Sequence, residues 1–221
     1  MIQSRLRPTT TVSMTQEVLQ AEKFPRRTQR RQQTRARIIS AADKLFRTVG
    51  YGAATMAAIA DEADVHVTTL FTHFKTKHDL AVSMNEQSVA ILESMVAEAK
   101  GVRPFFDFYL NLVMNTASRF EAAGDPGASV WRQLSLDPAL AFAWMQYEER
   151  QAELLSEYVA HDYGLDPDTD YRPRMVAHLL LSASSVSHRR WAESDRPLNL
   201  QTETRAAVEL AIRMARSVLA D

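Results

Sequence analysis

The stretch from residue 55 to residue 80, TMAAIADEADVHVTTLFTHFKTKHDL, constrains the fold more than any other part of the chain. Thr55 is a good N-cap, and the apolar residues that follow it at helical spacing predict a short helix. Asp64 then interrupts the pattern, and Asp tolerates the left-handed backbone that a tight turn needs. A second short helix is predicted from His66 to Phe74. Two short helices joined in this way form a helix-turn-helix, whose second helix fits the major groove of DNA.

The composition favours an all-helical protein around this motif. The 221 residues include only 6 Gly, whereas Ala, Leu, Arg, Glu and Met, which favour helices, are plentiful. The absence of Cys excludes a disulfide framework, a thiol nucleophile and a thiolate metal site. No apolar run approaches the roughly 18 residues of a membrane span, and no signal peptide is visible. We therefore expect a cytoplasmic protein with no membrane partner.

The charge of the chain is distributed unevenly. Residues 1–80 contain 13 Lys and Arg against 7 Asp and Glu, a net charge of +6, whereas the rest of the chain has a net charge of −7. A basic first third on an acidic body predicts a polyanionic partner for the first part only. We interpret residues 1–32 as a flexible basic arm, residues 33–80 as the helix-turn-helix domain and residues 81–221 as an effector-binding and dimerisation domain.

The arm and its junction with the first helix are rich in Arg. Next to a helix-turn-helix, such a density of Arg predicts contacts with phosphates or entry into the minor groove of DNA. The alternative is a solvated, disordered tail without a partner. The arginines predicted to bind DNA are Arg26, Arg27, Arg30, Arg31 and Arg35.

Hydrophobic periodicity and capping residues predict about nine helices in the whole chain. The first helix of the head is expected at 33–49, and Thr76 with Asp79 predicts a capping box at the beginning of a long helix that ends near residue 100. The later helices are expected at about 104–122, around 130, 138–162, 173–193 and 200–220.

Residues 33–80 resemble the N-terminal domain of the TetR/AcrR family of bacterial transcriptional regulators. The resemblance is carried by Ile59-Ala60 in the first short helix, Ala63-x-Val65 in the turn, Leu70-Phe71-x-x-Phe74 in the second helix and Lys77-x-x-Leu80 after it. It implies a ligand-responsive DNA-binding regulator, most often a homodimeric repressor that a small-molecule effector releases from a palindromic operator.

Three residues depart from the family pattern. Asp64 stands where the family usually has Gly in the turn, and His66 stands where it usually has Ser. Asp is able to adopt the required backbone, and His is a weaker cap or a phosphate donor. Phe71 stands where the family often has Tyr, whose hydroxyl reaches a phosphate, so we expect that contact to be lost.

The second helix and its flanks are predicted to contact DNA through hydroxyls, imidazoles and one ammonium group. The helix has no Arg, Asn or Gln, so the strongest bidentate contacts to bases are absent from it. Lys77 combines a cation with the free N–H groups of a helix N-terminus, which predicts a phosphate clamp. The predicted contacts are Thr55, His66, Val67, Thr68, Thr69, Thr72, His73 and Lys77.

The resemblance, rather than any individual residue, implies an effector cavity in the body of the protein. Aromatic residues with a few polar groups are typical of small-molecule sites, although each of them is also compatible with an ordinary core. The residues predicted to line the cavity are Phe105, Phe108, Tyr109, Met114, Trp131, Trp144, Met145, Tyr147, His178 and His188. The identity of the effector is open.

The last two predicted helices are the expected dimer surface. Their apolar residues spread wider than a single core stripe needs, and two such helices from each subunit form a four-helix bundle, as the resemblance also implies. Burial within one subunit is the alternative. The residues predicted at the interface are Leu180, Ser184, Ser187, Trp191, Val208, Ala211, Ile212, Ala215 and Leu219.

No constellation of residues predicts catalysis or a metal site. Glu149, Glu153, Glu157 and His161 follow one another at i, i+4 spacing, for which a solvated helix face is the expected explanation. The chain has no Gly-rich phosphate loop and no hydrolase or metalloprotease motif. We expect neither an enzyme nor a cofactor. The alternatives are a small-molecule-binding protein or enzyme that retains a helix-turn-helix head, and a sequence-nonspecific DNA-binding protein.

Overall fold

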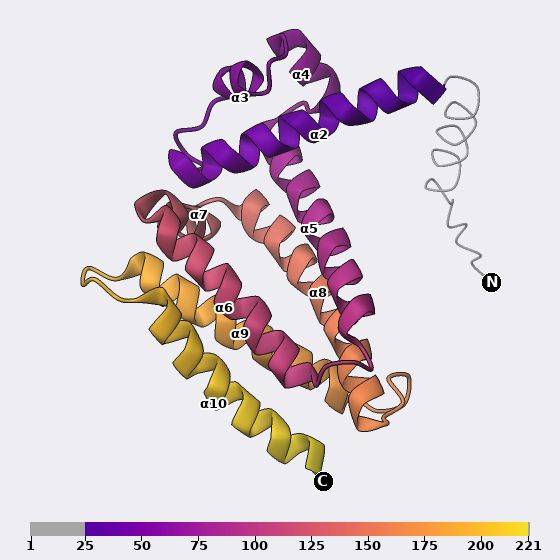
Figure 1. Ribbon diagram of the computed structural model, residues 1–221. Helices are drawn as coiled ribbons and strands as arrows, with labels where there is room; N and C mark the ends of the chain where they lie inside the picture. Colours follow the sequence, from indigo (N-terminus) through magenta and orange to yellow (C-terminus); the bar gives the residue numbers. More distant parts are fainter. Residues whose placement is uncertain (1–24, 221) are drawn as a thin grey trace, which may run out of the picture.

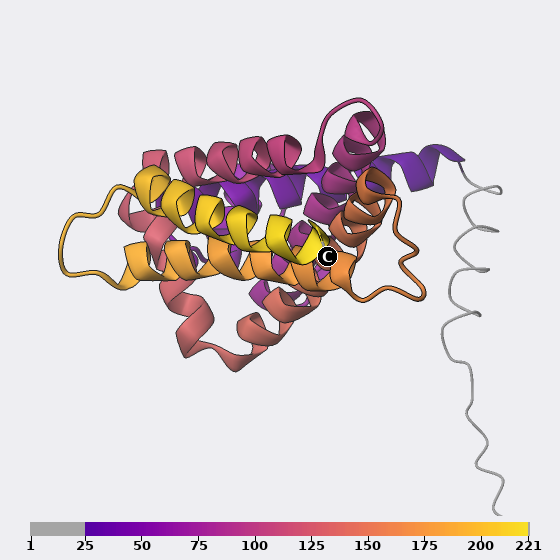
Figure 2. The same cartoon turned by 90° about the horizontal axis from the view of Figure 1, so that it is seen from below.

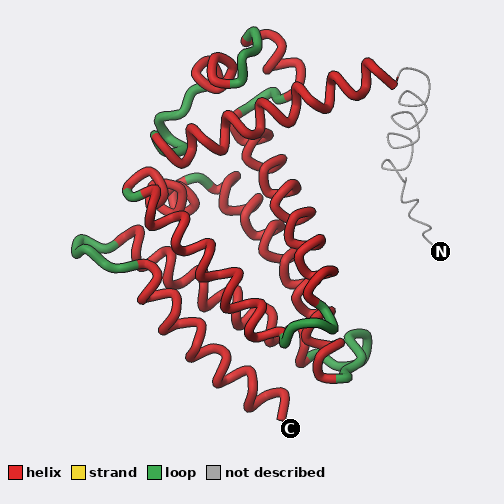
Figure 3. The backbone as a smooth tube through the Cα atoms, in the orientation of Figure 1, coloured by secondary structure: helices red, strands yellow, loops and turns green. Residues whose placement is uncertain are grey.

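The computed structural model describes residues 25–220, and all regular structure in this part of the chain is helical (Figures 1 and 3). This confirms the all-α fold with a helix-turn-helix head and a helical body. The nine helices of the described residues are α2 (Pro25–Thr48), α3 (Met56–Glu62), α4 (Val67–His73), α5 (Lys77–Ala99), α6 (Phe105–Ala123), α7 (Asp125–Leu136), α8 (Pro138–Tyr163), α9 (Arg172–Glu193) and α10 (Leu200–Ala220).

The head consists of α2, α3, α4 and the first turns of α5. The side chains of Ile38, Ile59, Leu70 and Leu80 are fully buried at its centre. Leu80 belongs to α5, whose later residues pack into the body, so the proposed domain boundary at residue 80 lies inside a helix. A continuous helix therefore joins the head to the body (Figure 1).

The local signals that predict the helix-turn-helix are confirmed. The side chain of Thr55 accepts a hydrogen bond from the backbone N–H of Ala58 at 3.1 Å. Asp64 has a φ of 51°, the left-handed conformation that the turn requires. Thr76 and Asp79 form a reciprocal capping box at the beginning of α5.

The beginning of α2 corrects one prediction. Residues 25–32, expected in a flexible arm, are helical and extend α2 beyond the head (Figure 1). Arg and Gln have high helix propensity, and Pro25 fits the first turn of a helix, so the dense positive charge did not indicate disorder. The remainder of the predicted arm, residues 1–24, lies outside the described residues.

The body is built from the remainder of α5 and from α6 to α10. Its main core includes the fully buried side chains of Tyr109, Leu155, Tyr158 and Leu180. Helices α9 and α10 lie side by side along one flank of the molecule in both views (Figures 1 and 2). None of the helices between residues 25 and 220 combines the length and apolarity needed to cross a membrane.

Candidate functional site

Helix α4 is positioned by an imidazole cap. His66 has an extended backbone, and its Nδ1 lies 3.4 Å from the backbone nitrogen of Thr68 and 2.8 Å from the Thr68 hydroxyl. The expected role of His66 as an N-cap is therefore confirmed. A ring nitrogen that accepts from a backbone N–H leaves the proton of the neutral ring on Nε2, which remains a donor for a DNA oxygen.

The outer face of α4 differs slightly from the predicted one. His66, Thr68 and Thr72 are exposed, whereas Val67, Thr69 and His73 are half-buried. Phe71, which the sequence analysis did not include among the DNA contacts, is 41% exposed. Its ring offers an apolar surface to a thymine methyl group even though it lacks the hydroxyl of Tyr.

The beginning of α2 brings positive charge close to α4. Burial, and then the positive charges of Arg31 and Arg35, lower the pKa of His73 at the end of α4. The arginines of α2 and the imidazole of α4 therefore lie near one another. Arg26, Arg27, Arg30 and Arg31 are exposed, and no carboxylate of residues 25–220 pairs with any of them.

Arg35 has a different environment from the arginines before it. Its guanidinium lies 4.8 Å from the ring centroid of Phe74 and donates to the hydroxyl of Ser83 at 2.8 Å. It also lies 4.0 Å from a carboxylate oxygen of Glu86. These contacts join α2 to α4 and α5, so Arg35 positions the head in addition to any contact with DNA.

Lys77 is also engaged within the head. Its ammonium donates to the backbone carbonyls of Tyr51 at 2.5 Å and Ala54 at 3.0 Å, and it lies 4.4 Å from the Tyr51 ring centroid. Burial lowers the pKa of Lys77. The geometry favours a positioning role, in which Lys77 fixes the loop before α3, over the predicted phosphate clamp. The backbone N–H groups at the beginning of α5 still offer a place for a phosphate.

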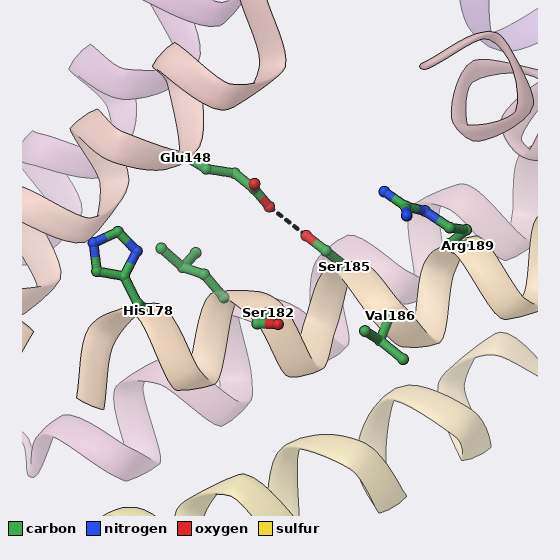
Figure 4. A pocket seen from close by; sticks show the side chains of 7 residues that line it. Glu148, His178, Ser182, Ser185, Val186 and Arg189 are labelled. Atoms are coloured by element: carbon green, nitrogen blue, oxygen red, sulfur yellow. Dashed lines mark hydrogen bonds between the residues drawn. The ribbon is translucent and has the colours of Figure 1, made fainter. Parts of the chain in front are cut away.

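The residues predicted to line one effector cavity fall into three groups. Phe105, Phe108 and Tyr109 are buried in the main core. Met114, Met145 and His178 lie apart from that core: Met114 borders α10 and Met145 is exposed. His178 lies in an open hollow of about 340 Å³ between α8 and α9, where Glu148 accepts a hydrogen bond from Ser185 (Figure 4). The remaining four residues form one cluster: Trp131, Trp144, Tyr147 and His188.

This aromatic cluster is the most continuous of the three groups. The ring centroids of Trp131 lie 4.9 Å from those of both Trp144 and His188. Phe120, which the sequence analysis missed, meets the edge of His188 at 5.5 Å. The cluster brings together α6, α7, α8 and α9, so a ligand among these rings would contact four helices.

The predicted dimer interface needs correction, because most of its residues are buried inside the single subunit. Six of the nine are buried inside the subunit, where they cannot touch a partner: Leu180, Ser187, Val208, Ala211, Ala215 and Leu219. They form the stripe of α9 and α10 that faces the core of the subunit. A hydrophobic stripe predicts that a helix face is buried, but it does not distinguish burial in the same subunit from burial against a partner. The exposed large apolar side chains of the two helices are Met175, Val186, Leu210 and Met214.

Helix α7 connects the aromatic cluster to the head. Leu134 packs against both the head core and the cluster that contains Trp131. Gly50, at the end of α2, has a φ of +84°, and a Cβ on it would lie 2.5 Å from the hydroxyl of Ser129 on α7. The head thus approaches α7 so closely that only Gly fits at residue 50.

We expect Gly50→Ala to destabilise the protein by about 2 to 4 kcal/mol, because it adds a contact with Ser129 to the strain of a left-handed residue. The matched control is Gly124→Ala, where φ is +63° and no atom lies within 4 Å, so only the strain remains. Urea unfolding of both variants and of Gly50→Ala with Ser129→Ala measures the difference. If both single variants lose the same free energy of unfolding, the contact between residue 50 and Ser129 does not limit the side chain at residue 50.

Two of the glutamates at i, i+4 spacing on α8 form ion pairs with arginines. Glu149 pairs with Arg174 on α9, and Glu153 pairs with Arg150. Within residues 25–220, no group of three or more His, Asp or Glu side chains is arranged to hold a metal ion.

Comparisons with known protein families match both parts of the chain. Residues 38–84 match the model described as bacterial regulatory proteins, tetR family, and residues 113–215 match the model of the MftR C-terminal domain. The first match covers the helix-turn-helix, and the second covers most of α6 to α10.

Two curated proteins are similar over most of the chain. The HTH-type transcriptional regulator TcmR of Streptomyces glaucescens is 27% identical over 165 residues, which cover 72% of this chain and 73% of TcmR. The HTH-type transcriptional activator FasR of Mycolicibacterium smegmatis is 27% identical over 193 residues, which cover 82% of each chain.

Solved structures share the fold at lower identity. A TetR-family regulator from Mesorhizobium loti has a TM-score of 0.59 and 20% identity, with 84% of this chain and 98% of that chain covered. The FadR repressor of Thermus thermophilus, in complex with lauroyl-CoA, has a TM-score of 0.56 and 23% identity, with 80% and 93% covered.

Proposed function

The chain belongs to the TetR family of bacterial regulatory proteins, and we propose that it acts in the bacterial cytoplasm as a homodimeric repressor that a small-molecule effector releases from a palindromic operator. The observation that carries the proposal is the exposed face of helix α4, which His66 caps. Beside it lies the beginning of α2, where Arg26, Arg27, Arg30 and Arg31 have no carboxylate partner among residues 25–220. The role needs binding at two sites and no catalytic step.

In this proposal α4 enters the major groove. Thr68 and Thr72 offer hydroxyls to base edges or phosphates, and Phe71 offers an apolar surface. The arginines of α2 follow the backbone beside the groove and supply a sequence-independent part of the affinity. Two heads held about 34–36 Å apart by a dimer would read two half-sites on one face of the DNA.

The proposed dimer surface is the outward face of α9 and α10. Met175, Leu179, Ser182 and Val186 follow one another at helical spacing on α9, and all four are exposed or half-buried. On α10, Leu210 and Met214 are each 52% exposed. A second copy of this face would cover these side chains and form a four-helix bundle.

The proposed signal passes through α7. An effector that displaces Trp131 moves the helix that also carries Ser129 against Gly50 in the head. A ligand that binds one arrangement of α7 better than the other changes the spacing of the heads, and the DNA changes the ligand affinity by the same factor.

A mobility-shift assay with DNA that flanks the gene for this protein tests the proposed function. We expect salt-sensitive, sequence-specific binding, and we expect Thr68→Ala with Thr72→Ala to weaken it by about tenfold or more, because each base contact contributes about 1 to 3 kcal/mol. Ser94→Ala, which removes an exposed hydroxyl from α5 in the body, is the control.

Two outcomes contradict this function. If unrelated competitor DNA removes the protein from every fragment equally, the protein is a nonspecific DNA-binding protein. If no fragment is bound at low salt, the head has lost its role, and a small-molecule-binding protein is the better interpretation.

A further inference from the structure

Three buried polar atoms in the body have no hydrogen-bond partner among the described residues: the Tyr109 hydroxyl, Trp131 Nε1 and His188 Nε2. An unpaired polar atom in the interior costs about 1 to 3 kcal/mol, so such atoms are uncommon in proteins. Two of the three, Trp131 Nε1 and His188 Nε2, belong to rings whose centroids are only 4.9 Å apart. These two atoms lie in the aromatic cluster that α7 shares with α6, α8 and α9.

The hydrogen bond at the other nitrogen of His188 defines what Nε2 offers. Nδ1 lies 2.8 Å from the carbonyl oxygen of Ser184, and a carbonyl only accepts, so Nδ1 carries the proton. Nε2 of the neutral ring is therefore an acceptor. Burial lowers the pKa of His188, which keeps the ring neutral near pH 7.

The indole of Trp131 offers the opposite group. Nε1 of an indole is always a donor, and the Trp131 side chain is buried. The cluster thus presents one unpaired donor and one unpaired acceptor from adjacent rings. A neutral hydroxyl matches both atoms chemically, because its oxygen accepts from an indole N–H and its hydrogen is donated to an imidazole nitrogen.

The walls around these atoms are aromatic. Phe120 meets the edge of His188, and Trp144 meets Trp131 with an interplanar angle of 69°. Trp144 and Trp191 are half-buried and pack on the cluster, so they are the side chains that would move to admit a ligand. Aromatic rings favour stacked and edge-to-face partners, which suits a planar ligand.

We propose that Trp131 and His188 recognise the effector, and that the effector is a planar aromatic compound with a hydroxyl group. The inference rests on the proposed function, because it names the ligand class of the body in a ligand-responsive regulator. The hydroxyl oxygen accepts from Trp131 Nε1 and donates to His188 Nε2, while the ring of the compound packs among Phe120, Trp131 and Trp144.

Charged ligands fit this pair poorly. A carboxylate would satisfy Trp131 but would face the lone pair of His188 Nε2, and an ammonium group would face the N–H of Trp131. Both would lose their hydration in a cluster of aromatic rings. A neutral hydroxyl avoids both conflicts with a single atom.

Calorimetric titration of the full-length protein with two probes tests the inference. 2-Naphthol donates and accepts, whereas 2-methoxynaphthalene has the same rings and only accepts. We expect 2-naphthol to bind about tenfold or more tightly, because the methyl ether leaves His188 Nε2 unpaired. Trp131→Phe and His188→Phe keep a ring at each position. His188→Phe is expected to abolish the preference, because it removes the acceptor that only 2-naphthol satisfies, whereas Trp131→Phe is expected to weaken the binding of both probes and to leave the preference in place.

The control variant is Trp191→Phe, which makes the same chemical change in a half-buried Trp whose nitrogen is not one of the unpaired buried atoms. It is expected to keep the preference for 2-naphthol. Circular dichroism and binding to DNA without a probe show whether each variant is folded.

Four results overturn the inference. These are equal affinities for the two probes, a preference that survives in His188→Phe, an affinity for 2-naphthol weaker than about 1 mM, and binding of lauroyl-CoA in place of 2-naphthol. Equal affinities would indicate that a buried water satisfies both nitrogens. Since specific DNA binding is measured without a probe, each of these results leaves the proposed regulator intact, whereas a failure to bind DNA rejects it.

Discussion

Replacing Arg26, Arg27, Arg30 and Arg31 together by Ala is expected to weaken operator binding by two or more orders of magnitude at moderate salt. These side chains are exposed and have no carboxylate partner in residues 25–220, so phosphates are their natural counterions. If each contacts one phosphate in both subunits, the slope of log K against log salt should become shallower by about 7, at about 0.9 for each contact. Fluorescence anisotropy at several salt concentrations measures the slope.

The matched control replaces the same four residues by Lys. Ala and Lys both favour helices, so α2 should remain folded in both variants, but only the Lys variant keeps the charge. We expect its salt slope to stay close to that of the original protein. An unchanged slope in the Ala variant would mean that the beginning of α2 does not approach DNA. A loss of affinity at unrelated and operator DNA alike would confirm that these residues supply no sequence specificity.

The parts of the fold that the sequence predicts well are those whose causes are local. Thr55, Asp64 and Thr76 each act on the backbone within three or four residues, so their effects follow from the sequence alone. The ends of most helices could be predicted for the same reason. The beginning of α2 could not, because the high charge of residues 25–32 and their high helix propensity favour opposite interpretations.

The parts that could not be predicted depend on contacts between distant segments. The periodicity of α9 and α10 predicts that Leu180 and Val208 are buried, but it does not show whether residues of the same subunit or of a partner bury them. The three carbonyl partners of Lys77 lie more than twenty residues earlier in the chain, so its contacts inside the head could not be predicted from the residues around it. The aromatic cluster likewise joins Phe120, Trp131 and His188 from three helices.

The second large effect concerns dimerisation, and it follows from which side chains of α9 and α10 are exposed. We expect Leu210→Asp with Met214→Asp to produce monomers, because two like charges on each copy would face one another in a surface that excludes water. Since both side chains are half exposed in the single subunit, the change should leave the subunit folded. Sedimentation velocity measures the mass, and circular dichroism measures the helix content.

The same variant should bind an operator with two half-sites at least about a hundredfold more weakly. In a dimer, binding of one head raises the effective concentration of the other head at its half-site, and a monomer lacks this effect. It should bind a single half-site as well as the original protein does. The control is Val102→Asp, at a side chain that is 84% exposed beyond the end of α5 and far from α10 in sequence, which should remain dimeric. A dimer of unchanged stability in the double variant would mean that copies associate through another face, and the spacing of the two heads would then have to be set by helices other than α9 and α10.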